Sequence, residues 1–156
     1  MADLRRAFFG IGKTKFYATV GRALAPLDTM LLRVSRGRLG VGVTVGLRTL
    51  LLSTIGKRSG LPREVPLVFL RQRDGFLVVG SNWGGEHHPA WTVNLLARPE
   101  ATAIVAGTTI PVSGTLLTGA ERAEAWTAIT TYWPAYATYA ERADHREIRV
   151  FRLTPR

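Results

Sequence analysis

The segment Leu50–Pro66, with the sequence LLLSTIGKRSGLPREVP, contains two apolar runs separated by a short basic turn. The runs 50–54 and 65–70 are rich in Leu, Val and Phe and have the length of strands, whereas glycine and proline interrupt the connection between them. The pattern therefore predicts two strands joined by a tight turn. Four polar side chains stand out in this turn: Lys57, Arg58, Ser59 and Arg63.

This turn is a candidate anion-binding site. Gly56 and Gly60 let backbone N–H groups approach a ligand closely. Three cations and a hydroxyl can neutralise and hydrogen-bond phosphate or carboxylate oxygens. A basic hairpin turn that only meets solvent is the alternative interpretation.

The rest of the chain continues the alternation of short apolar runs and turns. Connections at 73–74 and at Gly107 are short enough for hairpins, which favours antiparallel neighbours over βαβ crossovers. The expected strands are 44–54, 64–72, 75–81, 101–106, 109–117 and 148–153. The expected helices are an N-terminal one ending near Arg33, 89–97 and 120–132, with a kink or break at Pro134. These elements predict an α+β fold in which antiparallel strands close, or nearly close, a small barrel.

Length and composition set the organisation of the chain. Its 156 residues are 46% hydrophobic, as expected for a single domain with one core. We expect a basic amphipathic helical segment over 1–35 and a barrel over 36–156. Cysteine is absent, which excludes disulfides, thiolate metal sites and a cysteine nucleophile and is compatible with a reducing cytoplasm. His87 and His88 are adjacent and lack the i, i+4 spacing of a helical zinc pair, so no metal site is expected.

The formal charge of +10 comes from the N-terminal part of the chain. Residues 1–63 contain 12 Lys and Arg against two acids, Asp3 and Asp28, whereas residues 64–156 contain nine of each sign. Such an excess fits nucleic acid, an anionic membrane surface or a small acidic ligand. No recognition-helix motif or RNA-binding signature accompanies the charge, which argues against nucleic acid as a partner.

The N-terminal segment mixes aromatic and aliphatic side chains with cations. Its apolar members are Leu4, Phe8, Phe9, Phe16, Leu24, Leu27, Leu31 and Leu32, and its cations include Arg5, Arg6, Lys13, Lys15 and Arg22. Such a segment can lie on an anionic membrane surface, or it can cover the barrel, and both interpretations stay open. No run reaches the roughly 18 apolar residues of a spanning helix. We expect a cytoplasmic protein, with peripheral association at the inner face of the cytoplasmic membrane as an open alternative.

A second glycine loop follows the strand that ends at Ser81. Residues 80–101 read GSNWGGEHHPAWTVNLLARPEA, in which Pro89 suits a first helical turn and Pro99 stops the helix. The segment thus has the order strand, glycine loop and helix.

The run YWPAYATY at 132–139 concentrates aromatic side chains. In a continuous helix Tyr132, Tyr136 and Tyr139 would share one face, with Trp126 and Trp133 on a neighbouring face. These rings can pack on the barrel or can line a substrate site.

Five motifs in this order carry a family resemblance: TIGKRSGLPR, PLVFL, VVGSNWGG, HPAWTVNLLARP and YWPAYATY. Together they resemble the deazaflavin-dependent nitroreductase family, whose relatives include actinobacterial quinone reductases. The resemblance implies a split β-barrel of the FMN-binding-like kind. It also implies hydride transfer from reduced coenzyme F-420, a deazaflavin with a phosphodiester and a glutamate tail, to a quinone, a nitroaromatic or another electron-poor unsaturated acceptor.

The resemblance assigns roles to individual residues. For cofactor binding it implies Lys57, Arg58, Ser59 and Arg63 at the phosphate and tail, and Val79, Gly80, Ser81, Asn82, Trp91 and Asn94 elsewhere along the cofactor. It implies an aromatic substrate side formed by Trp133, Tyr136 and Tyr139, with Ser81 and Tyr136 as the candidate catalytic side chains. Two positions depart from the pattern, because relatives carry tyrosine at Trp133 and some carry lysine at Asn82.

Two other functions are compatible with the sequence. The chain could hold a deazaflavin or another anionic ligand without turnover. It could also be an FMN-dependent oxidase of the same barrel fold, because a basic turn suits the phosphate of either flavin. The sequence does not decide the physiological acceptor or the oligomeric state.

Overall fold

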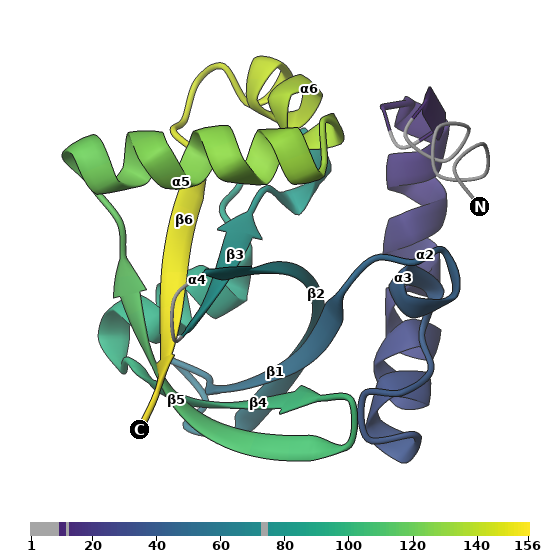
Figure 1. Cartoon of the computed structure of the whole chain (residues 1–156), viewed down its shortest axis with the longest axis vertical. Coiled ribbons are helices and arrows are strands. Elements are labelled where there is room, and N and C mark those ends of the chain that lie inside the picture. The colour runs from purple at the N-terminus through teal and green to yellow at the C-terminus, as the bar shows by residue number, and fades with distance from the viewer. Residues whose placement is uncertain (1–9, 12, 73–74) are drawn as a thin grey trace.

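The structure is a computed structural model that describes residues 10–11, 13–72 and 75–156. Its helices are α2 (Lys15–Val34), α3 (Val41–Thr44), α4 (Ala90–Ala97), α5 (Gly119–Tyr132) and α6 (Ala135–Arg142), with a 3-10 turn η1 (Asn82–Gly84). Its strands are β1 (Thr49–Ile55), β2 (Pro62–Gln72), β3 (Gly75–Gly80), β4 (Glu100–Val105), β5 (Thr108–Leu116) and β6 (Arg149–Pro155). Figure 1 shows a barrel with α5 and α6 across one end and α2 beside it.

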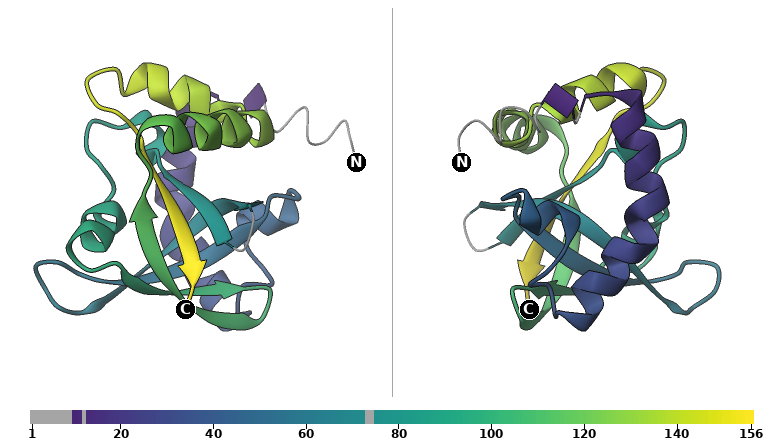
Figure 2. Two further views of the ribbon diagram at one scale, coloured as in Figure 1. Left: turned by 60° about the vertical axis from the view of Figure 1, so that its left-hand side comes forward. Right: turned by 90° about the vertical axis from the view of Figure 1, so that its right-hand side faces the viewer.

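The strands form a closed antiparallel barrel in the order β1-β2-β3-β6-β5-β4. Pairing of β1 with β4 closes it, with Leu52 opposite Ala103. The first hairpin pairs Thr54 with Arg63 and Ile55 with Pro62, so the basic turn begins directly where the ladder ends. This turn extends outward beyond the barrel (Figure 2). The predicted α+β split barrel is confirmed.

The barrel interior is one core, and a second core lies outside it beneath α5 and α6. The interior core receives side chains from all six strands, among them Leu52, Phe69 and Phe151. Along β3, Val78 belongs to the interior core and Val79 to the second one, as expected from the alternation of a strand. Because both faces of β3 are covered, every residue of this strand is buried.

One predicted strand begins several residues later in the structure, and one predicted break is found where it was expected. The strand expected over 44–54 begins only at Thr49, because residues 41–44 form α3 and Gly46 adopts a left-handed φ of 78°. A hydrogen bond of 2.8 Å from Leu47 N to Gly42 O completes this turn. The break expected at Pro134 is confirmed, since α5 ends at Tyr132 and α6 begins at Ala135.

Helix α2 packs on β1 and β2 and is held there by polar and close contacts. Arg33 Nε donates to Glu64 Oε2 at 2.6 Å, and a Cβ on Gly21 would lie 3.1 Å from Trp83 Nε1. The helical N-terminal segment is therefore confirmed over 15–34, and this part covers the barrel. Residues Leu4, Arg5, Arg6, Phe8 and Phe9 lie outside the described residues.

Candidate functional site

Two adjoining hollows form the candidate site. The first, the inner cavity, is enclosed by α2, β2, the end of β3 and the aromatic residues Trp133, Tyr136 and Tyr139. The second, the basic groove, lies between the β1–β2 turn and α4. Val65, Pro89 and Trp91 line both hollows, so the two lie side by side and share part of their walls.

The basic groove gathers the residues that the first motif singles out. Lys57, Arg58, Ser59 and Arg63 all line it and are exposed. Gly60 has a left-handed φ of 68°, and a Cβ on Gly56 would lie only 2.5 Å from Ser59 Oγ. The shape of the turn therefore favours glycine at Gly60, and a side chain at Gly56 would require the Ser59 hydroxyl to move. Their N–H groups close it, with Gly56 N bound to Leu61 O and Gly60 N bound to Gly56 O, each at 2.8 Å.

Asn94 of α4 holds this turn in place. Its Oδ1 accepts from Lys57 N at 3.0 Å, and its Nδ2 donates to Thr54 Oγ1, also at 3.0 Å. Asn94 is buried, so these bonds form away from competing water. Asn94 lines the groove, but both polar atoms of its amide are already hydrogen-bonded to the turn and to β1. Its side chain therefore holds the backbone that carries Lys57 and Arg58.

The loop after β3 carries Ser81, which lines the inner cavity. The loop is strained, because Asn82 and Trp83 both have left-handed φ values, 47° and 50°. Asn82 Nδ2 donates to His87 O at 3.0 Å, and Arg22 Nη2 of α2 donates to Asn82 O at 3.3 Å. The side chain of Asn82 is thus used within the loop.

Arg146 fixes this loop from the other side. Its guanidinium donates to Ser81 O at 2.8 Å, to Gly85 O at 2.9 and 3.0 Å and to Gly80 O at 3.4 Å. It also lies 3.3 Å from His88 Nδ1. Burial, with the charges of Arg149 and Arg146, lowers the pKa of His88, so the ring is neutral near pH 7 and accepts this contact.

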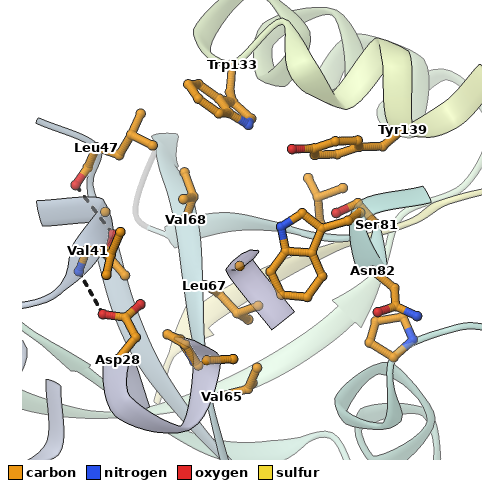
Figure 3. Close-up of a pocket in the computed structure, with 18 of the residues that line it drawn as sticks. Asp28, Val41, Leu47, Val65, Leu67, Val68, Ser81, Asn82, Trp133 and Tyr139 are labelled. Atoms are coloured by element: carbon orange, nitrogen blue, oxygen red, sulfur yellow. Dashed lines mark hydrogen bonds between the residues drawn. The ribbon is translucent and has the colours of Figure 1, made fainter. Parts of the chain in front are cut away.

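The aromatic residues that the resemblance assigns to the substrate all line the inner cavity. All three side chains, Trp133, Tyr136 and Tyr139, are buried. The rings of Tyr136 and Tyr139 pack edge to face, with their centroids 6.0 Å apart. Figure 3 shows Trp133 and Tyr139 on the α5–α6 side of the cavity, with Ser81 near Tyr139. Burial raises the pKa of Tyr136 and that of Tyr139 above the ordinary value, so both phenols keep their protons and can donate hydrogen bonds.

Tyr132 does not join them, although a continuous helix would place it on the same face. Helix α5 ends at Tyr132, and the Tyr132 hydroxyl instead accepts from Arg48 N at 3.0 Å. Trp126 also lies outside the lining of the cavity and packs against Arg122, with the guanidinium carbon 5.3 Å from the ring centroid.

Sequence reasoning missed three residues of the site. Tyr17 and Asp28 of α2 line the inner cavity, and Arg146 fixes its loop. The sequence does draw attention to Asp28, because it is one of only two acidic residues among the first 63. No sequence pattern points to Arg146, because it follows a helix and its hydrogen bonds go to carbonyls 61 to 66 positions earlier in the chain.

Two further observations concern the described residues alone. Nowhere among them do three or more His, Asp or Glu side chains gather in a group that could hold a metal ion. None of the helices formed by the described residues is both long and apolar enough to span a membrane.

Residues 24–155 match the family model described as F420H(2)-dependent quinone reductase. The chain belongs to this family. The matched range includes the basic turn, the β3 loop, α4 and the aromatic residues of α6.

Individual relatives agree with the family assignment. An F420H(2)-dependent quinone reductase of Mycobacterium tuberculosis is 35% identical over 81 residues, which are 52% of this chain and 54% of the relative. The chain thus spans about half the length of this curated relative. A solved F420-H2 dependent reductase is 31% identical with a TM-score of 0.62 and covers 68% of this chain and 93% of its own.

A more distant structure shares only the fold. A heme storage protein from Vibrio cholerae, 15% identical, has a TM-score of 0.56 over 71% of this chain and 83% of its own. The barrel is therefore found in proteins whose sequences have diverged far from this one.

The raised pKa of Tyr136 predicts a dependence of stability on alkaline pH. The folded state holds this proton more tightly than the unfolded state, where the pKa is about 10. The resulting stabilisation is complete below about pH 10 and is lost as the pH rises further. Tyr136→Phe should therefore lose less free energy of unfolding than the wild type between about pH 8 and about pH 10.5, as measured by urea unfolding. Equal losses in the two proteins would contradict the assignment.

Proposed function

We propose that this protein is an F420H2-dependent reductase that transfers a hydride from reduced coenzyme F-420 to a quinone or another electron-poor unsaturated acceptor, nitroaromatics included. The observation that carries the proposal is that the basic groove adjoins the aromatic inner cavity, with Val65, Pro89 and Trp91 lining both. The family and the relatives named above support it, since their names state F420H2-dependent quinone reduction.

The residues present fit the deazaflavin cofactor. Its phosphodiester and glutamate tail are anionic, and the groove offers the side chains of Lys57, Arg58, Ser59 and Arg63 as donors. The groove also runs past the first turn of α4 at Ala90 and Trp91, where the helix N-terminus favours negative charge. Flavin phosphate would meet the same donors, but the comparisons give no support to FMN.

The backbone at the end of β3 can hold the cofactor ring. A Cβ on Gly80 would lie 2.6 Å from Thr92 Cγ2, so only glycine lets the strand end approach α4 this closely. Arg146 binds the carbonyls of Gly80 and Ser81 and so keeps this edge rigid. Val79 and Ser81 then line the inner cavity from one side.

Bound reduced deazaflavin supplies a hydride, that is, one proton with two electrons. A quinone that receives it needs one further proton to become a hydroquinone, so the cavity must supply hydrogen-bond donors to the acceptor oxygen. Ser81 and the protonated Tyr136 both line the cavity and serve this purpose. Either hydroxyl would donate a hydrogen bond to the acceptor oxygen, and the further proton would reach that oxygen from solvent.

A rival function is cofactor binding without turnover. One assay separates the two: catalytic amounts of protein are added to reduced coenzyme F-420 with menadione. Loss of the absorbance of the reduced cofactor over many turnovers supports the reductase, and a loss no faster than in the absence of protein supports the binding protein.

The basic groove predicts which cations bind the cofactor. Replacing Lys57, Arg58 and Arg63 with alanine should weaken coenzyme F-420 binding by about tenfold or more and reduce the salt dependence of the affinity, because each removes a charge-assisted contact. Fluorescence titration at low and moderate salt measures both. Arg98→Ala is the matched control, since Arg98 is exposed and lines neither hollow. Unchanged affinity in the triple variant would remove the groove as the cofactor site.

Tyr136 should act on the acceptor and not on the cofactor. Tyr136→Phe should lower kcat by at least about tenfold while the affinity for coenzyme F-420 changes little, because the phenol donates on the acceptor side. Stopped-flow turnover and fluorescence titration measure the two quantities. Tyr132→Phe is the control, since that hydroxyl binds Arg48 N outside the cavity. A parallel loss of rate and cofactor affinity would indicate a structural role.

We also propose peripheral association with an anionic membrane surface through α2. Phe16, Leu27, Met30 and Val34 are spaced to share one helix face and are 75%, 50%, 54% and 79% exposed. This face is opposite the one that packs on the barrel with Ala18 and Leu32. Arg36 and Arg38 follow the helix directly, where they can meet lipid phosphates.

This surface predicts the effect of adding negative charge to it. Val34→Glu with Met30→Glu should abolish most cosedimentation with anionic vesicles, because both side chains would have to enter the lipid interface. Leu96→Glu is the control, since Leu96 is 49% exposed on α4. Undiminished sedimentation of the double variant would reject the surface.

A further inference from the structure

The two hollows of the site differ in charge. The basic groove is lined by three cations, Lys57, Arg58 and Arg63, and by Glu64. Among the described residues that line the inner cavity, Asp28 is the only one with a charged side chain. The end that would receive the acceptor is therefore apolar with a single carboxylate, whereas the end that would receive the cofactor is cationic.

The carboxylate of Asp28 is fixed in the wall of the cavity. Its Oδ1 accepts from Val41 N at 2.7 Å (Figure 3). A Cβ on Gly40 would lie 2.9 Å from the same oxygen, so the chain between α2 and α3 passes directly against the carboxylate. Within the part of the chain that the structure describes, no Lys, Arg or His forms an ion pair with Asp28.

The negative charge acts on other groups in the cavity. Tyr17 lines the same cavity, and its pKa is raised first by burial and then by the charge of Asp28. A charge facing a partly enclosed apolar space acts more strongly on a ligand than the same charge in water would. A second negative charge brought into this cavity is therefore disfavoured, and a positive one is favoured.

We propose that Asp28 makes the inner cavity select acceptors by charge, so that neutral and cationic quinoid or aromatic acceptors are reduced and anionic ones are rejected. This inference rests on the proposed function of the cavity as the acceptor site, and it adds the charge class of the acceptor. It also explains why the site divides as it does, because the cofactor tail and the acceptor enter regions of opposite charge.

A purely structural role for Asp28 makes a different prediction. If the carboxylate served only to accept from Val41 N, its charge would not affect which acceptor binds. Asp28→Asn separates the two roles, because the amide oxygen can still accept from Val41 N while the negative charge is gone.

The test uses three naphthoquinones: menadione, an analogue bearing a sulfonate and an analogue bearing a trimethylammonium group. Their dissociation constants for the full chain without cofactor are measured by quenching of tryptophan fluorescence, since Trp83, Trp91 and Trp133 line the cavity. Their kcat/KM values are then measured with reduced coenzyme F-420. We expect the wild type to bind and reduce the cationic and neutral compounds better than the anionic one.

In Asp28→Asn the preference for the cationic over the anionic compound should fall by about tenfold, with menadione little changed. Asp144→Asn, which makes the same change in net charge at a side chain that is 85% exposed and outside the cavity lining, should keep the wild-type preference. Leu24→Lys adds a positive charge to the cavity lining without touching the Val41 contact, and should shift the preference in the same direction as Asp28→Asn.

The outcomes separate this inference from the proposed function. An unchanged preference in both Asp28→Asn and Leu24→Lys, or an equal change in Asp144→Asn, would overturn charge selection even if menadione is turned over rapidly. A charge preference in binding that Asp28→Asn removes supports the inference, and it does so even if no compound is reduced, in which case only the proposed function fails.

Discussion

The closure of the barrel by β1 is the constraint on which the rest of the structure depends. This strand pairs with β2 on one side and β4 on the other, so its backbone groups are satisfied and no edge is left open. The same strand ends where the basic turn begins and carries Thr54, to which Asn94 of α4 donates. The position of the cationic groove relative to α4 is therefore set by the closed ladder and one buried amide.

A second level of organisation is the strained loop between β3 and α4. Two consecutive non-glycine residues in left-handed conformations are unfavourable by themselves. They persist because Arg146 holds the carbonyls of Ser81 and Gly85, and Arg22 holds that of Asn82. Helix α2, through Arg22, and the segment before β6, through Arg146, both bind this loop, which carries Ser81 into the lining of the inner cavity. The local strain is offset by contacts that come from both ends of the chain.

The site that results has a chemical gradient along its length. Cations line the outer part, and Trp91 lies where the two hollows meet. The inner part contains buried phenols that keep their protons and one fixed carboxylate. This order suits an anionic cofactor with a flat reactive ring that must meet a flat, less charged acceptor. It also gives α2 a direct part in the site, since Tyr17 and Asp28 form its wall.

The barrel, its hairpins, the basic turn and the aromatic run can all be predicted from the amino-acid sequence. Those features depend on local patterns: strand periodicity, glycine and proline in turns, and three cations and one hydroxyl within seven positions. Three features are visible only in the folded chain: α2 lines the cavity, the Tyr132 hydroxyl accepts from Arg48 N, and Arg146 binds the β3 loop. These depend on contacts between residues 61 to 84 positions apart or on the packing of a helix against the barrel, and no local pattern of side chains encodes which distant partner a backbone carbonyl or a hydroxyl will meet.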